Sequence, residues 1–353
     1  MRTLLTHADW GGSSYYRLLF AAEVLQQQGA DITTDYFGKS IYAETDKEMT
    51  VTHIRKLDFD VVVLHRPMTR TAAQAIPMLQ AQGIAVVVEL DDDFWSIRAD
   101  NVFRPGVAPA TNPNHNWQWL TECCKAADLV TVSTPALRKK IPNKNVRVLR
   151  NCVPSKYFEV SNVMGKAHDE VKGRLIVGWS GSLETHGGDL NACGTSIATA
   201  VRNAGARFMC VGSEEPATTL GFRDGETVFI PWVPFEEYPV AVDVFDIGIV
   251  PLKLYAFNAS KSGLKGLEYS SLSIPFVASP TPEYLRLAKL GAGVIAERKH
   301  DWLSKLRLLL ENPLYRRDMS ESGLEVAKKN TYEEHSWKWL EAWNDAGEIR
   351  RAA

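Results

Sequence analysis

Short apolar runs alternate with longer amphipathic segments along the whole chain. This alternation is typical of βαβ units and therefore of parallel sheets. In the first half, the expected strands are residues 2–6, 31–37, 60–64, 84–90, 128–133 and 146–149. The expected helices are residues 14–28, 71–82, a segment that ends at residue 127, and residues 136–141. Residues 100–116 are rich in Pro and Asn and are expected to form a long, functional loop.

The same alternation starts again after a linker at residues 151–172. Its expected strands are residues 175–179, 207–211, 227–230, 244–250, 275–278 and 293–296. Its expected helices are residues 190–203, 261–272, 283–290, 302–311, 315–329 and 332–350. A chain of 353 residues is too long for one ordinary core and suits two domains of about 150 to 200 residues. We therefore predict an α/β fold with two Rossmann-like, doubly wound parallel-sheet domains. Their expected limits are residues 1–160 and 161–331, followed by a C-terminal helix, residues 332–353, that packs back towards the first domain.

The predicted helix 261–272 carries the most unusual charge pattern, with Ser260 as its expected N-cap and Pro275 beyond its end. Lys261, Lys265 and Glu268 would lie within about 60° of one another on its surface. Two lysines one turn apart at the positive end of the helix dipole are unfavourable by a few tenths to ~1 kcal/mol. A bound diphosphate would make the same arrangement favourable, because both lysines and the helix N-terminus attract an anion. An ordinary solvated face with weak Lys–Glu pairs explains this helix equally well when it is taken alone.

Other polar residues follow predicted strands and therefore lie on the same edge of the sheets. Ligands of open α/β sheets bind at the carboxyl ends of the strands, so we expect a site in a central cleft between the domains. The further candidates are the turn at Gly11 and Gly12, His65, residues 91–93, residues 180–186, residues 211–213 and Trp232. Each is weak alone, because a Gly pair is more often a simple turn and a strand-end His is more often structural.

Composition and charge narrow the class of protein. Hydrophobic residues make up 45% of the chain and charged residues 23%, which is ordinary for a globular protein. A net charge of −2 gives no overall attraction to nucleic acid or anionic lipid, so any such contact must be a local patch. The five cysteines include no CxxC, and no His stands at metal-ligand spacing, which favours a reduced cytoplasmic protein without structural zinc. A strand is expected almost at the N-terminus, at residues 2–6, which leaves no room for a signal peptide, and no apolar run approaches the ~20 residues of a membrane span.

With these residues identified, the whole chain resembles the GT-B glycosyltransferases of the large group 4 type (glycosyl transferases group 1). The segment DFDVVVLHRP resembles the strand that ends in the active-site histidine of that family. AADLVTVSTPAL and VRVLRNCVPSKYF resemble the segments before and at the interdomain crossing. ARFMCVGSEE, VFIPWVPFEEYP and FDIGIVPLKLYAFNASKSGLKGLEYSSLSIPFVAS follow the family's donor site in order. The turn SGSLETHGGD and the run ELDDDFW look most like small members from bacteriophages and bacterial surface-polysaccharide loci.

The resemblance implies roles for individual residues. His65 takes the place of the active-site histidine, Glu268 that of the acid that holds the ribose hydroxyls, and residues 231–233 frame the base. Two departures matter: Ser182 and His186 stand near an expected Arg and Lys, and Ser260 stands where a further acid is usual. The diphosphate would therefore depend on Lys261 and Lys265, and the identity of the sugar cannot be carried over. The expected donor-binding residues are Gly11, Gly12, Ser180, Gly181, Ser182, His186, Gly212, Trp232, Val233, Ser260, Lys261, Lys265 and Glu268.

The activity implied by the resemblance is transfer of a hexosyl or pentosyl unit from a UDP- or GDP-sugar to an acceptor hydroxyl, with retention. Because lysines and helix N–H groups would neutralise the leaving diphosphate, we expect no metal to be required. Residues 1–160 would form the acceptor side and residues 161–331 the donor side. We expect His65 and Asp91 at the reacting centre, and Arg66, Asp92 and Asp93 on the acceptor side. The expected partners are the nucleotide sugar and a glycan, protein or hydroxymethylated phage DNA, without integral membrane contact, for a cytoplasmic monomer or homodimer.

A basic stretch near the interdomain crossing leaves the acceptor open. It contains Arg138, Lys139, Lys140, Lys144, Arg147, Arg150 and Lys156. We favour a solvated surface, because like-charge runs are often no more than that. The alternative is an anionic acceptor such as DNA, whose binding would fall steeply with salt.

Three other functions compete with this prediction. Asp91 and Asp93 match the metal-binding DxD of GT-A glycosyltransferases, but the phosphate-binding features of this chain lie after residue 175. The chain could instead be a nucleotide-sugar-binding module that has lost catalysis. An NAD-dependent oxidoreductase is the third option, but the turn HADWGGSSYY lacks the GxGxxG spacing.

Overall fold

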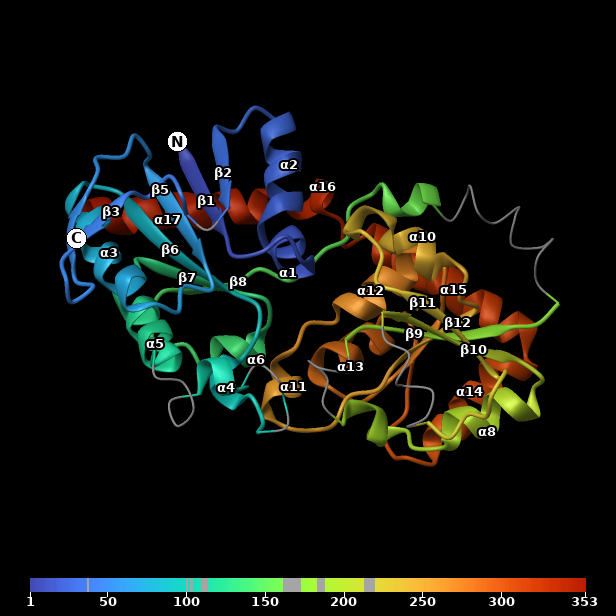
Figure 1. The fold of residues 1–353 in the computed structure, drawn as a ribbon. Helices are drawn as coiled ribbons and strands as arrows, with labels where there is room; N and C mark the ends of the chain where they lie inside the picture. The colour runs from blue at the N-terminus through green and yellow to red at the C-terminus, as the bar shows by residue number, and fades with distance from the viewer. Residues whose placement is uncertain are drawn as a thin grey trace.

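The computed structural model describes residues 1–36, 38–99, 101, 104–108, 114–160, 173–182, 188–212 and 220–353. These ranges form two lobes, the first coloured mostly blue to green and the second green to red (Figure 1). Each lobe is built on a six-stranded parallel sheet with helices packed against it. The predicted fold class, two Rossmann-like doubly wound domains, is confirmed.

The first sheet lies in the N-terminal lobe. From edge to edge its strands are β2 (Ile32–Tyr36), β1 (Thr3–His7), β5 (Val61–His65), β6 (Ala85–Leu90), β7 (Leu129–Val132) and β8 (Val146–Val148). Every residue of β1, β5, β6 and β7 is buried, as expected for parallel strands covered on both faces. Its helices are α1 (Gly12–Ser14), α2 (Phe20–Gln27), α3 (Arg70–Ala81), α4 (Arg104–Val107), α5 (Asn116–Ala126) and α6 (Pro135–Arg138).

The second sheet follows the same plan. Its strands, in spatial order, are β11 (Thr227–Pro231), β10 (Arg207–Gly212), β9 (Ile176–Ser180), β12 (Ile247–Val250), β13 (Phe276–Ala278) and β14 (Val294–Ile295). Its helices are α8 (Ser196–Asn203), α10 (Tyr238–Asp243), α11 (Ala256–Ser260), α12 (Leu264–Ser271), α13 (Pro282–Lys289), α14 (Asp301–Glu311) and α15 (Pro313–Lys328). Short 3₁₀ turns occur at Phe94–Ser96, Asp189–Ala192 and Phe235–Glu237.

The strand order reverses once in each sheet. In the first sheet the chain moves from β1 to β2 and then returns to place β5 on the other side of β1. In the second sheet it moves outward through β9, β10 and β11 and then places β12 beside β9. Connections on opposite sides of the sheet leave a crevice at such a switch point, which is where ligands of this kind of fold bind.

The chain ends with α16 (Tyr332–His335) and α17 (Trp337–Ala352). Figure 1 shows α17, in red, running along the sheet of the N-terminal lobe, and its residues contact β6 and β7. Trp339 and Trp343 are buried there. Trp337, at the start of the same helix, is 52% exposed.

Several local features depart from the sequence prediction. An antiparallel hairpin, β3 (Ala43–Thr45) with β4 (Val51–Ile54), was not expected. The first helix is continuous from α1 to α2 but contains a π-helical turn, Tyr15–Leu19. The predicted loop 100–116 contains the short helix α4, and parts of that loop and of the linker 151–172 lie outside the described residues.

Among the helices that the structure describes, none has both the length and the apolar character needed to cross a membrane.

Candidate functional site

A cleft of about 940 Å³ lies between the lobes, at the two switch points. Its N-terminal wall comes from the turns after β1, β5 and β6, and its C-terminal wall from the turns after β9, β11 and β12 together with α12. Both switch points therefore face the same space. The predicted site residues that line it are Gly11, Gly12, Arg66, Asp91, Asp92, Ser180, Gly181, Ser182, Trp232, Val233, Lys261, Lys265 and Glu268.

The prediction of one helix over residues 261–272 is wrong. Helix α11 ends at Ser260, whose side chain bonds back to Ala256, and Lys261 has extended backbone angles (φ −66°, ψ 147°). Helix α12 begins only after Gly263, where a Cβ atom would lie 2.8 Å from Leu287 Cδ1 of α13. The Ser-Gly pair before α12 thus breaks the helix and brings its first turn against α13. Lys261 and Lys265 do not share one helical face.

Lys261 instead reaches across the cleft. Its Nζ lies 3.6 Å from Asp92 Oδ1 of the N-terminal lobe and 4.7 Å from the centre of the Phe257 ring. The carbonyl of Ser260 accepts a hydrogen bond from Thr134 Oγ1 at 2.8 Å, so this short segment joins the two lobes at several points. Lys261 therefore forms an ion pair between the two lobes at the cleft.

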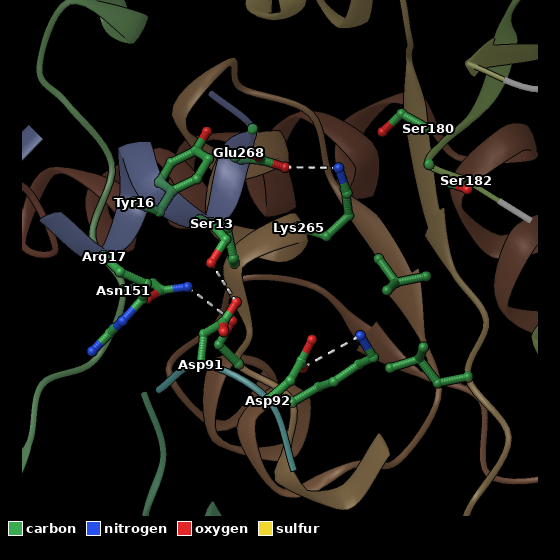
Figure 2. Close-up of a pocket in the computed structure, with 18 of the residues that line it drawn as sticks. Ser13, Tyr16, Arg17, Asp91, Asp92, Asn151, Ser180, Ser182, Lys265 and Glu268 are labelled. Atoms are coloured by element: carbon green, nitrogen blue, oxygen red, sulfur yellow. Dashed lines mark hydrogen bonds and ion pairs between the residues drawn. The ribbon is translucent and has the colours of Figure 1, made fainter. Parts of the chain in front are cut away.

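Lys265 stands in the first turn of α12, beside a buried acid. Its Nζ lies 3.0 Å from Glu268 Oε2 and donates to the hydroxyl of Tyr238 at 2.7 Å. The Tyr238 hydroxyl in turn lies 3.1 Å from Glu268 Oε2. Burial alone would lower the pKa of Lys265, but the Glu268 carboxylate raises it above its ordinary value. The ammonium group is therefore held charged in the first turn of α12, at the cleft, where Figure 2 shows it pointing towards Glu268.

His65 does not line the cleft, because Ser13 covers it. Its Nδ1 accepts from the backbone N–H of Ala8 at 3.3 Å, so Nε2 carries the proton and donates to Ser13 Oγ at 3.0 Å. Ser13 Oγ then donates to Asp91 Oδ2 at 2.8 Å. Burial lowers the pKa of His65 most, and the neighbouring Arg66 guanidinium lowers it further, to about 3. The expected active-site histidine is thus a neutral group behind the cleft wall.

The buried neutral state of His65 predicts a pH-dependent stability. The folded-state pKa lies below the unfolded value of about 6.5, so the unfolded chain binds the proton more readily. This contribution is present above pH 6.5 and is lost as the pH falls. The free energy of unfolding should drop by about 2 kcal/mol more between pH 7 and pH 5 in the wild type than in His65→Gln, measured by urea denaturation. His300→Gln is the matched control, because His300 is 73% exposed. Equal pH slopes for His65→Gln and the wild type would contradict this assignment.

Asp91 is held by a two-point ion pair with Arg66. Arg66 Nε donates to Asp91 Oδ1 at 2.7 Å, and Nη2 donates to Oδ2. Although burial raises the pKa of Asp91, the Arg66 guanidinium holds it well below its ordinary value. Arg66 itself has a left-handed backbone (φ 52°), and a non-glycine residue held in that region often marks a functional site. Figure 2 shows Ser13 and Asp91 pointing towards each other at the cleft.

Four predicted residues take different places from those expected, and a fifth lies outside the described residues. Asp93 is fully buried, 3.9 Å from Lys140 Nζ, so it does not face an acceptor. Ser260 is buried at the junction of the lobes. Gly212 (φ 109°) lies behind Trp232, whose ring would be 3.0 Å from an added Cβ. His65 lies behind Ser13. His186 is the residue outside the described ranges.

The structure also brings residues to the cleft that the sequence did not single out. They are Asp9, Trp10, Ser13, Arg17, Asn151, Tyr238 and Ser262. Ser13 follows directly after the Gly pair, so its place at the cleft could have been predicted from the sequence. Tyr238 was not, because its contact with α12 joins segments that are far apart in the chain. Asn151 Nδ2 donates to Ser262 Oγ at 3.0 Å and links the crossing segment to the turn before α12.

In the ranges that the structure describes, no group of three His, Cys, Asp or Glu side chains is placed to hold a metal ion.

Comparison with known proteins supports the fold. No protein-family model matches the sequence, and no curated protein matches it significantly. Among solved structures, Anabaena Alr3699/HepE in complex with UDP-glucose aligns with a TM-score of 0.66 and 12% identity, over 97% of this chain and 100% of that one. Sucrose-phosphate synthase from Thermosynechococcus elongatus aligns with a TM-score of 0.69 and 14% identity, over 100% of both chains. UDP-GlcNAc 2-epimerase from Neisseria meningitidis, bound to UDP-GlcNAc, aligns with a TM-score of 0.56 and 16% identity, over 97% of this chain and 99% of that one. The chain therefore has the GT-B fold, and the reaction must be argued from the site.

Proposed function

We propose that this protein is a glycosyltransferase that moves a sugar from a UDP- or GDP-sugar to an acceptor hydroxyl. The observation that carries the proposal is the cleft at the two facing switch points, with the N-terminus of α12 and Lys265 on one wall and the Ser13–Asp91–Arg66 group on the other. The similarity in fold to HepE, whose structure holds UDP-glucose, supports a nucleotide sugar as the donor.

The donor diphosphate would bind at the start of α12. The first N–H groups of a helix have no partners within the helix and lie at the positive end of its dipole. Lys265 adds a positive charge there, and Lys261 stands just before it. Gly11 and Gly12 on the opposite wall leave room for the sugar-phosphate bond close to the backbone of the N-terminal lobe.

The nucleoside would extend from α12 towards β11. Trp232 lines the cleft and is 59% exposed, so one face of its ring is available to a base. Glu268 is the proposed partner of the ribose hydroxyls, and its contacts with Lys265 and Tyr238 keep the carboxylate oriented. Ser180, which contacts Tyr238 at 2.9 Å, completes this wall.

The proposed reaction breaks the bond between the anomeric carbon and the diphosphate oxygen and forms one to the acceptor oxygen. The acceptor hydroxyl attacks from the face of the leaving group, so the configuration is retained, and its proton passes to the departing phosphate. Lys261, Lys265 and the α12 N–H groups stabilise the negative charge that develops on the diphosphate. Asp91 faces the reacting sugar, and His65 is a positioning residue that holds Ser13.

Because cations of the chain neutralise the leaving group in this proposal, turnover should not require a divalent metal. The rate of donor consumption in about 5 mM EDTA should stay within about twofold of the untreated rate. Addition of Mg²⁺ or Mn²⁺ after chelation is the control. A loss of activity that either metal restores would assign the acidic run at Asp91 and Asp92 to metal binding instead.

The experiment that tests the proposed function is turnover of a panel of UDP- and GDP-sugars with mixed acceptors, followed by NMR of the products. The proposal predicts release of the nucleoside diphosphate and a product with the anomeric configuration of the donor. A product of inverted configuration would overturn the mechanism. Nucleotide binding without release would identify an inactive binding module, and a changed sugar still attached to its nucleotide would identify an epimerase.

A further inference from the structure

An exposed tryptophan projects from the first turn of the N-terminal lobe. Trp10 lies between β1 and α1, lines the cleft and is 59% exposed. Its ring stacks on Tyr36 (centroids 5.5 Å apart, 30° between planes) and meets the ring of His7 edge-on at 4.5 Å. His7 Nδ1 lies 2.8 Å from the carbonyl oxygen of Asp9. The indole is therefore held in place on one side while much of its surface faces the cleft.

We propose that Trp10 is the platform on which one sugar ring of a carbohydrate acceptor stacks. This inference rests on the proposed function and names its acceptor class. A pyranose ring has an apolar C–H face and a rim of hydroxyl groups, so a flat, fixed aromatic ring removes that face from water at little entropic cost. A carboxylate beside the aromatic ring can then accept hydrogen bonds from the sugar hydroxyl groups.

Asp9 is that acid. Its Oδ1 accepts from the backbone N–H of Gly11 at 2.8 Å and from Ser14 Oγ at 2.9 Å, which fixes the carboxylate next to Trp10. Its Oδ2 lies 3.5 Å from Arg66 Nη1, a long contact, and the side chain remains 40% exposed. Oδ2 can therefore take a hydrogen bond from an acceptor hydroxyl without losing a strong internal partner.

The charge of this wall favours a neutral acceptor over a nucleic acid. The charged residues of the N-terminal lobe that line the cleft are Asp9, Arg17, Arg66, Asp91 and Asp92. Arg17 is fully buried, with Nε donating to Glu89 at 2.8 Å, and Arg66 is paired with Asp91. Asp92 faces Lys261 of the other lobe, so among these five residues Asp9 is the charged group without a close ion pair. This wall therefore offers no unpaired cation, which a phosphate backbone needs.

The basic stretch near the interdomain crossing does not supply those cations, because none of its residues is among those that line the cleft. Four of its members are paired with acids: Lys140 with Asp93, Arg147 with Asp345, Arg150 with Glu283, and Lys156 with Glu23. These pairs hold elements of the fold together. They favour the solvated surface expected from the sequence rather than a DNA-binding face.

Two tryptophans of equal exposure allow a matched test, since Trp10 and Trp232 are both 59% exposed in the cleft but belong to opposite lobes. Each variant of the 353-residue chain is titrated with UDP and GDP by calorimetry. Each is also assayed with labelled donor on a panel of neutral di- and trisaccharides, a Ser/Thr peptide and hydroxymethylcytosine DNA. Trp10→Ala should raise the KM for the saccharide roughly 10- to 100-fold, with kcat changed much less and nucleotide affinity unchanged. Trp10→Phe should recover most of the loss. Trp232→Ala should weaken nucleotide binding and leave the saccharide KM close to the wild-type value.

The possible outcomes separate this inference from the proposed function. If the wild type consumes a donor but labels only DNA or the peptide, the carbohydrate platform is overturned and the proposed function stands. An unchanged saccharide KM in Trp10→Ala would also overturn the carbohydrate platform and leave the proposed function standing. If the wild type binds no nucleotide and consumes no donor, the proposed function fails and the platform fails with it.

Discussion

The Lys265→Ala variant should bind UDP or GDP about 10- to 100-fold more weakly than the wild type, as measured by calorimetry. Lys265 lies in the first turn of α12 and is the proposed partner of the donor diphosphate. A hydrogen bond between an ammonium group and a phosphate contributes ~1.5 to 3 kcal/mol, which corresponds to that loss. The variant also leaves Glu268 buried without its cation, so the free protein should melt at a lower temperature.

The control for this variant is Lys328→Ala. Lys328 pairs with Glu325 at 2.8 Å across the same spacing of three residues, but on α15, outside the cleft. Its removal should leave nucleotide affinity unchanged. Lys265→Arg keeps the charge and should retain part of the affinity. Unaltered nucleotide binding in Lys265→Ala would show that the diphosphate is not held at α12.

The second large effect is expected for Asp91→Ala, which should lower the free energy of unfolding by about 3 kcal/mol. The change removes the two hydrogen bonds that Arg66 donates to Asp91 and the carboxylate that accepts from Ser13 Oγ. Breaking a buried ion pair costs ~3 to 5 kcal/mol, and we expect the lower end because Asp91 and Arg66 side chains retain 15% and 22% exposure. The measurement is urea denaturation followed by intrinsic fluorescence.

Asp58→Ala is the matched control, because Asp58 also pairs with an arginine, Arg2, but is 89% exposed. A pair on the surface contributes ~0 to 1 kcal/mol, so this variant should unfold almost like the wild type. If both variants lose the same stability, the Asp91–Arg66 pair does not anchor the cleft wall. Sugar transfer by Asp91→Ala should fall as well, because Arg66 and Ser13 lose their fixed positions.

The sequence predicts the parts of the fold that depend on strong local patterns. The continuous apolar runs at β5 and β6 specify buried parallel strands, and the alternation with helices specifies two doubly wound sheets. The predicted strands also gave the residues at their carboxyl ends. Arg66, Asp91 and Trp232 were therefore expected at the cleft, and they line it in the structure. Their roles in binding and catalysis remain predictions.

Features that depend on contacts between distant segments were not predictable in this way. The apolar pattern of residues 261–272 fits one helix, but the close approach of Gly263 to Leu287 decides where α12 begins. His65 ends a strand as expected, yet only the three-dimensional path of the turn after β1 shows that Ser13 covers it. The stacking of Trp10 on Tyr36 joins the turn after β1 to the end of β2, so the sequence alone does not reveal it.

The most direct test of the central claim is a crystal structure of the protein with UDP bound. The account predicts that diphosphate oxygens lie within about 2.7 to 3.2 Å of the first backbone N–H groups of α12 and of Lys265 Nζ, with the base beside Trp232. A diphosphate held through a metal ion on Asp91 and Asp92, or bound away from α12, would contradict it.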